Sequence, residues 1–239
     1  MKSSALSNSN IKAVIFDLDD TLWPVAPVIV HAENVLYAWL KEHAPKAVKK
    51  YTIEQLRDKR LALMGTDARF NYDLWALRHT SLREVFDEIG EPIGKADRAM
   101  QIFADARNQV TLYDDVLSGL PLIKQRVLMG SISNGFADLE AIGLDHHFHV
   151  SLAAHRFGCA KPDPRIFHAA CAALECQPEQ VLFVGDDLLL DVKAAQRVGM
   201  QGVWMKRREH AKDDALLHEV KPDAIVTNIH ELLPLFDAS

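Results

Sequence analysis

The sequence predicts an α/β protein with a Rossmann-like parallel sheet core and an inserted all-helical cap domain. Over residues 112–239, short apolar segments rich in Val, Ile and Phe alternate with helix-like segments, which is typical of a parallel sheet covered by helices on both faces. A similar apolar segment stands near the start of the chain, and residues 24–111 between the two show helical spacing without a strand pattern. We therefore expect a core from residues 11–23 and 112–239, a helical cap from residues 24–111, and a frayed tail at residues 1–10.

The first element of the core is an apolar run from residue 11 to residue 16, interrupted only by Lys12, which predicts a buried strand. Asp17 and Asp19 follow at its carboxyl end, where open α/β sheets bind their ligands. If the backbone stays extended, the two side chains point the same way. Two carboxylates that close repel each other unless a cation or a proton lies between them. The stretch therefore predicts a functional site, and Asp20 beside it is expected to be a turn acceptor.

The segment after this strand contains four helix-like stretches, and its charges are nearly balanced. In the first stretch, Ile29, Leu36 and Leu40 fall on one helical face. Most of the net charge of −6 therefore falls on the core, which makes sense if core carboxylates hold a metal ion and the cap supplies cations to a substrate. The predicted helices cover residues 28–40, 53–64, 71–89 and 96–110.

The rest of the core alternates regularly between strands and helices. Polar residues again follow the strands, with Ser133 and Asn134 after one of them. Asp186 and Asp187 follow another strand, and Asp191 comes shortly after them. The expected strands cover residues 127–131, 148–153, 181–184, 202–205 and 224–226, and the expected helices cover residues 115–125, 135–142, 164–174, 188–198 and 229–235.

These polar residues have structural as well as chemical interpretations. Ser133 can hydrogen-bond a phosphoryl oxygen, or it can cap the helix that follows. Lys161, placed just before Pro162, is held in a rigid extended segment and could neutralise an anion, although isolated lysines are usually solvated. Asp187 can serve equally as an acid at a helix N-terminus or as part of a site. Residue chemistry alone leaves these alternatives open.

Together these stretches resemble the four motifs of the haloacid dehalogenase-like hydrolase superfamily. DLDDT at residues 17–21 resembles the family's DxDxT motif, and SISNG at residues 131–135 resembles its second motif. KPDP at residues 161–164 and GDDLLLD at residues 185–191 resemble the third and fourth motifs. The helical segment lies between the first and second motifs, as in the subclass with a helical C1 cap. The resemblance covers nearly the whole chain except this segment.

The resemblance implies a role for each of the core residues. Asp17 would be the nucleophile that forms an aspartyl-phosphate, and Asp19 would be the general acid and base. Lys161 would neutralise the nucleophile and the transferring phosphoryl group. Ser133 and Asn134 would bind phosphate oxygens. The implied chemistry is phosphoryl transfer at the carboxyl edge of the sheet.

The same resemblance implies a Mg²⁺ cofactor. Asp17 and Asp186 would bind the ion through their carboxylates, and Asp19 would bind it through its backbone carbonyl. Asp191 would steady a metal-bound water or Lys161 without binding the ion itself.

Two residues complete the first motif and its surroundings. Thr21 is expected to fix the turn beside the phosphate site by local hydrogen bonding. Trp23 directly follows the motif and is the best-placed candidate to contact substrate. Weaker candidates for a cap pocket that takes an aromatic or anionic substrate, each equally able to serve as a packing residue, are Arg69, Trp75, Arg78 and Arg107.

The leading hypothesis is a Mg²⁺-dependent phosphatase that hydrolyses a small phosphomonoester through an aspartyl-phosphate. FDLDDTL and VGDDLLLDV resemble bacterial phosphatases that act on flavin mononucleotide (FMN) or on the ribitylaminouracil phosphate of riboflavin synthesis. A sugar-phosphate phosphatase and a phosphomutase of the same fold are alternatives, whereas Asp19 disfavours a 2-haloacid dehalogenase. The non-enzyme alternative is a receiver-like signalling or binding protein, but receivers are shorter and lack a helical insertion after the first strand.

Composition narrows the class of partner. The net charge of −6 argues against a nucleic-acid-binding protein, and no stretch approaches the length of a membrane span. Cys159, Cys171 and Cys176 have no CxxC spacing and are expected to be reduced thiols. The start of the chain lacks the apolar run of a signal peptide, so we expect a cytoplasmic protein with a small-molecule substrate. The oligomeric state is not readable from the sequence.

Overall fold

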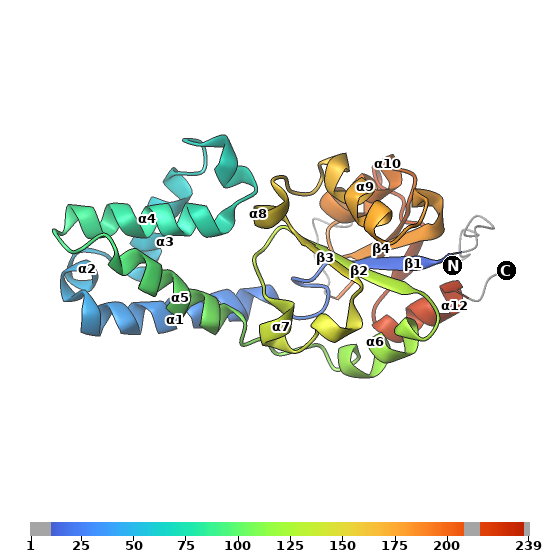
Figure 1. The fold of residues 1–239 in the computed structure, drawn as a ribbon, viewed down its shortest axis with the longest axis horizontal. Coiled ribbons are helices and arrows are strands. Elements are labelled where there is room, and N and C mark those ends of the chain that lie inside the picture. The colour runs from blue at the N-terminus through green and yellow to red at the C-terminus, as the bar shows by residue number, and fades with distance from the viewer. Residues whose placement is uncertain (1–10, 208–215, 237–239) are drawn as a thin grey trace.

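The computed structural model describes residues 11–207 and 216–236 of the chain. The predicted frayed tail, residues 1–10, lies outside the described residues. Figure 1 shows two lobes side by side, one built around a sheet and the other made of helices. None of the described helices is long and apolar enough to cross a membrane.

The sheet lobe is built on six parallel strands in the order β3-β2-β1-β4-β5-β6. Phe16 at the end of β1 pairs with Ser131 on one side and with Val184 on the other. The chain therefore moves outward from β1 in both directions, which places a ligand-binding crevice at the carboxyl end of this strand. The predicted parallel α/β core is confirmed. The strands are β1 (Ala13–Phe16), β2 (Leu128–Ser133), β3 (Val150–Ala153), β4 (Val181–Gly185), β5 (Gln201–Met205) and β6 (Ala224–Val226).

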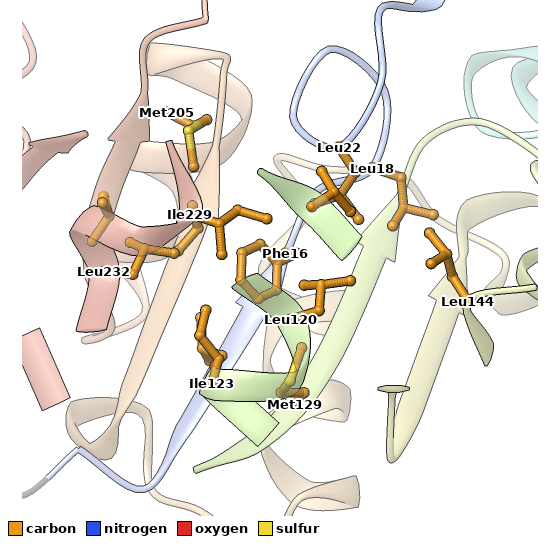
Figure 2. Packing of buried hydrophobic residues seen from close by; sticks show 14 of the residues in the cluster. Phe16, Leu18, Leu22, Leu120, Ile123, Met129, Leu144, Met205, Ile229 and Leu232 are labelled. Atoms are coloured by element: carbon orange, nitrogen blue, oxygen red, sulfur yellow. The ribbon is translucent and has the colours of Figure 1, made fainter. Parts of the chain in front are cut away.

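Helices cover both faces of this sheet, and alternating residues of each strand pack against them. On one face, Phe16 of β1 packs with Leu120 of α6 (Val116–Lys124) and with Ile229 near the C-terminus (Figure 2). On the other face, Ile15 packs with Phe167 of α9 (Pro164–Ala173). Figure 1 shows α6 and α12 (Leu233–Phe236) on one side of the sheet and α9 and α10 (Ala194–Arg197) on the other.

Three predicted core helices differ from the expectation, one in where it begins and two in the geometry of their first turn. The helix expected from residue 135 begins only at α7 (Leu139–Ile142), because Asp138 accepts the N–H groups of its first turn and acts as its N-cap. The helix expected over residues 188–198 starts as a π-helical turn, Leu188–Lys193, before α10. Such turns are rare and occur frequently at functional sites. The C-terminal helix likewise starts as a 3₁₀ turn, Ile229–Leu232, before α12.

The second lobe contains the helices predicted after the first strand, and residues 24–111 contain no strand. The helix expected from residue 71 begins at Leu74, because Asp73 caps it and the preceding residues form a 3₁₀ turn. The long helices α1 and α5 pack along each other and lead from and back to the sheet lobe (Figure 1). The helices are α1 (Val25–His43), α2 (Pro45–Lys50), α3 (Ile53–Ala62), α4 (Leu74–Glu88) and α5 (Lys95–Arg107).

The helical lobe has its own core, which also contacts one loop of the sheet lobe. Phe86, Met100 and Phe103 are almost fully buried within this core. Phe136, from the loop after β2, packs against it with its ring 6.1 Å from that of Phe103. The loop that follows β2 therefore packs against the helical lobe as well as the sheet lobe.

Candidate active site

Three carboxylates meet at the carboxyl edge of the sheet. Asp17 follows β1, Asp186 follows β4, and Asp191 lies on the π-helical turn after it. One oxygen atom of each lies within 4.8 Å of those of the others. The strands converge here because the sheet order changes direction at β1, so residues far apart in the sequence form one acidic cluster.

Lys161 is the cation inside this cluster. Its Nζ donates to Asp17 Oδ1 at 2.5 Å and to Asp191 Oδ1 at 2.7 Å, and the residue is only 5% exposed. Asn134 fixes the backbone of Lys161 from both sides. The Asn134 side chain donates to the Lys161 carbonyl at 3.0 Å and accepts the Lys161 N–H at 2.8 Å. The ammonium is thus held rigidly against the proposed nucleophile.

One ammonium does not balance three carboxylates in a buried site. Burial raises the pKa of Asp17 to about 7 and, with the charges of Asp17 and Asp191, raises the pKa of Asp186 to about 8. Burial also raises the pKa of Asp191. For Lys161, burial acts against the charge, but Asp17 and Asp191 raise its pKa overall. The cluster therefore carries surplus negative charge that an added cation would neutralise.

The donor set fits Mg²⁺. Its ligand atoms are carboxylate oxygens, which this hard cation prefers, and it needs only one or two carboxylates beside water. Both Asp191 oxygens are engaged, one by Lys161 and the other by the N–H of Asp187 at 3.0 Å. Among the described residues, the Asp186 carboxylate has no hydrogen-bond donor. Asp17 and Asp186 would therefore hold the ion, with Asp191 orienting Lys161.

A glycine makes this arrangement possible. A Cβ at Gly185 would lie 2.2 Å from Asp191 Oδ2, far closer than any real contact. The missing side chain lets the turn after β4 fold Asp191 back over the strand end. Asp187, for which the sequence left two roles open, accepts the N–H groups of Leu189 and Leu190 at 2.8 Å and so caps the π-helical turn.

Asp19 lies beside this cluster and is held by residues that enter and leave the helical lobe. Its Oδ1 accepts from Trp23 Nε1 at 2.8 Å, and Arg107 Nη2 lies 2.6 Å from Oδ1 and 2.7 Å from Oδ2. Asp20 adopts a positive φ of 59° and accepts the N–H of Val25, as expected of a turn acceptor.

The structure corrects the expected role of Trp23 as a substrate contact, whereas Thr21 makes a local contact of the kind expected of it. Both residues are fully buried, so neither presents surface to a ligand. Thr21 Oγ1 lies 3.5 Å from Asp17 Oδ2, and the Trp23 indole donates to Asp19. They support the two aspartates instead.

The loop after β2 lines the same pocket. Ser133 Oγ accepts the N–H of Gly135 at 3.0 Å, so it stabilises a turn and caps no helix. A Cβ at Gly135 would lie 2.8 Å from Asp19 Oδ2, which shows how closely this backbone approaches the acid. The pocket is lined by Asp17, Asp19, Asp20, Ser133, Asn134, Gly135, Lys161, Asp186, Asp187, Leu190 and Asp191.

The weaker cap candidates separate into three groups. Arg107 joins the site, a contact that the sequence did not predict because it depends on where α5 returns to the sheet lobe. Arg78 stacks 3.6 Å over Phe103 and, with Arg57 and Arg60, surrounds the buried Glu33. The last two, which line a separate groove along α4, are Arg69 and Trp75.

Comparisons with known proteins agree with this geometry. Residues 11–199 match the family model described as haloacid dehalogenase-like hydrolase. The 5-amino-6-(5-phospho-D-ribitylamino)uracil phosphatase YigB of Escherichia coli is 30% identical over 200 residues, which is 82% of this chain and 84% of that protein. A phosphoserine phosphatase of Thermus thermophilus is 31% identical over 166 residues, covering 66% and 65% of the two chains.

A solved structure extends the match to almost the whole chain. The crystal structure described as a 2-haloacid dehalogenase from Pseudomonas syringae superposes with a TM-score of 0.85 at 33% identity, covering 95% of this chain and 98% of that one. The family resemblance carried by the four motifs is therefore confirmed. The chain belongs to the haloacid dehalogenase-like hydrolase family and is a hydrolase of that family.

Proposed function

We propose that this protein is a Mg²⁺-dependent phosphatase that hydrolyses a small phosphomonoester through an aspartyl-phosphate on Asp17. The observation that carries the proposal is the contact of Lys161 with Asp17, next to carboxylates that lack a balancing cation. The Lys161 ammonium, 2.5 Å from Asp17, opposes the rise in the pKa of Asp17 that burial causes, and it also offers positive charge to an incoming phosphoryl group. The phosphatases among its relatives support this reaction class.

In the first step, an oxygen of Asp17 forms a bond to phosphorus while the bond from phosphorus to the ester oxygen breaks. Asp19 gives a proton to the departing oxygen, so an alcohol leaves and Asp17 carries the phosphoryl group. Lys161 stabilises the charge on the phosphoryl oxygens, and the Ser133 hydroxyl, which lines the same pocket, would donate to one of them.

In the second step, a water oxygen forms a bond to phosphorus and the bond to Asp17 breaks. Asp19, now a carboxylate, takes the proton of that water, which releases inorganic phosphate and restores both aspartates. A bound Mg²⁺ would supply positive charge for the phosphoryl oxygens in both steps.

The contacts of Asp19 favour phosphoryl transfer over dehalogenation, although one similar solved structure is described as a dehalogenase. Hydrolysis of a carbon–halogen bond releases a halide, which needs no proton, and it needs no metal site. This chain instead holds a second carboxylate beside the nucleophile and a cluster suited to a divalent cation. A phosphomutase of the same fold remains the alternative that shares these features.

For the substrate, we propose FMN or ribitylaminouracil phosphate. Ribitylaminouracil phosphate is supported by the similarity to the E. coli phosphatase, which extends over most of both chains, and FMN by the resemblance of the first and fourth motifs alone. Residues 24–111 would act as the cap domain, and residues 11–23 with 112–239 as the catalytic core. Sugar phosphates are the second substrate class that we propose. Side chains of the cap would select between the two classes.

The test is phosphate release from a panel that contains FMN, ribitylaminouracil phosphate, sugar phosphates and phosphoserine. The Asp17→Asn variant and a chelator accompany the native protein. We expect turnover that requires Mg²⁺ and is lost in the variant. Turnover by Asp17→Asn equal to that of the native protein would refute the mechanism, whereas turnover limited to sugar phosphates would refute only the substrate assignment.

A further inference from the structure

Asp19 is held entirely by residues at the two connections between the lobes. Trp23 lies just before α1, where the chain enters the helical lobe, and Arg107 is the last residue of α5, where the chain returns. The indole N–H and the guanidinium of these residues occupy both oxygens of the Asp19 carboxylate. The carboxylate is therefore tied to both connections at once.

The placement of Arg107 is determined by this contact. The side chain is only 2% exposed, and a single terminal nitrogen, Nη2, reaches both oxygens of Asp19 at 2.6 and 2.7 Å. The other terminal nitrogen, Nη1, is buried and has no hydrogen-bond acceptor among the described residues. Leaving a buried donor unpaired is costly. A guanidinium that served only to join the lobes would be expected to satisfy both nitrogens.

The pair also lies against the phosphate side of the pocket. A Cβ at Gly135 would be 2.8 Å from Asp19 Oδ2 and 3.5 Å from Arg107 Nη2. The loop after β2 therefore closes over the ion pair and limits how far Asp19 can move. The guanidinium carbon also lies 6.0 Å from the centre of the Trp23 ring, so the three side chains form one packed group.

We propose that Arg107 is a positioning residue for the general acid, which holds the carboxyl group of Asp19 at the leaving-group side of the pocket and makes its orientation depend on the placement of α5. This inference rests on the proposed function, because it assumes that Asp19 donates the proton in the first step. Arg107 itself transfers no proton. Its contribution is to restrict Asp19 to the orientation from which transfer is direct.

Proton donation matters most when the leaving group is a poor one. An alcohol expelled from an alkyl phosphate needs a proton as it departs, whereas p-nitrophenolate leaves readily without one. Loss of a positioned general acid should therefore slow alkyl esters far more than p-nitrophenyl phosphate. A purely structural role for Arg107 would slow both esters alike.

The experiment compares kcat/KM, which reports the step in which the leaving group departs, for an alkyl phosphomonoester and for p-nitrophenyl phosphate in the native protein and in Arg107→Met. Arg98→Met, an exposed position on the same helix, is the matched control. We expect Arg107→Met to reduce kcat/KM for the alkyl ester by on the order of 100-fold and for the aryl ester by less than about tenfold, the scale of general acid catalysis. Asp19→Asn should show the same selectivity, and adding Arg107→Met to it should cause little further selective loss.

Two further variants keep the test decisive if Arg107→Met does not fold. Arg107→Lys retains a charge at the same place and should restore part of the alkyl-ester activity, and Trp23→Phe removes only the indole N–H donor to Asp19. Each should show a smaller loss that is again selective for the alkyl ester, with folding checked by circular dichroism. Equal losses for the two esters in these variants would overturn the role of Arg107. No phosphate release from either ester by the native protein would instead refute the proposed function.

Discussion

The surplus negative charge of the acidic cluster predicts that the metal-free protein loses stability as the pH rises. Asp186 has a folded-state pKa of about 8, against an ordinary value of 3.8. Between these values the unfolded chain has released the proton that the folded chain still holds, so raising the pH favours unfolding. Stability associated with this group is therefore fully present below about pH 4 and is lost by about pH 8.

The size of the effect follows from the shift. One pKa unit corresponds to about 1.4 kcal/mol, so a shift of roughly four units sets an upper limit of about 5–6 kcal/mol. Asp17 and Asp191 titrate in the same site, so we divide the limit equally among the three carboxyl groups. We therefore expect ionisation of Asp186 to lower the free energy of unfolding by about 2 kcal/mol. For a chain of this size, about 2 kcal/mol moves the melting temperature by about 4–8 °C.

The perturbation that isolates the group is Asp186→Asn, which cannot ionise. Thermal unfolding in a chelator should show the variant more stable than the native protein at pH 8, with the difference vanishing near pH 4. Mg²⁺ should raise the melting temperature of the native protein at pH 8 and leave that of the variant nearly unchanged. If the native protein and the variant lost stability in parallel between pH 4 and pH 8, the assignment of surplus charge to this cluster would be wrong.

Three more predictions concern single side chains. Lys161→Met leaves Asp17 and Asp191 buried without their cation. We therefore expect phosphatase activity to vanish and the free energy of unfolding, measured by urea titration at pH 8, to fall by about 3–5 kcal/mol. An unchanged urea midpoint would count against the ion pairs. Gly185→Ala places a methyl group onto Asp191, and a loss of about 1–3 kcal/mol together with most of the activity is expected, which steady-state kinetics and urea titration would check. Glu33→Gln removes the carboxylate shared by three arginines in the helical lobe and should cost about 1–3 kcal/mol without abolishing phosphate release; a total loss of activity would indicate that this cluster serves the site directly.

Much of the core was predictable because its signals are local. A buried strand needs only a short apolar run, and β6 occupies residues 224–226 as expected. Carboxyl ends of parallel strands meet at one edge, so residues that directly follow β1 and β4, such as Asp17 and Asp186, were expected to meet, and the structure brings them together. The helical insertion was readable for a similar reason, since helical periodicity does not depend on distant partners.

What the sequence missed depends on distant partners. Arg107 could not be assigned to Asp19 because the contact spans 88 positions and is set by how α5 packs on α1. Trp23 follows the first motif and was expected to contact substrate, yet it is fully buried in the hydrophobic core of the sheet lobe. The helix start at residue 139 was also missed, because Asp138 accepts the N–H groups of Glu140 and Ala141 and so caps the helix four residues after the expected start.

The central position of β1 has a consequence for synthesis of the chain. This strand leaves the ribosome first, but its two neighbours, β2 and β4, begin at residues 128 and 181. The helices between residues 25 and 107 pack mainly on one another, so they can fold while the rest of the core is still being made. The first strand is then unpaired and apolar until β2, its first neighbour to be made, has emerged. We expect nascent chains that end before β2, at about residue 130, to depend on the folded helical lobe, or on a chaperone, to keep this strand from aggregating.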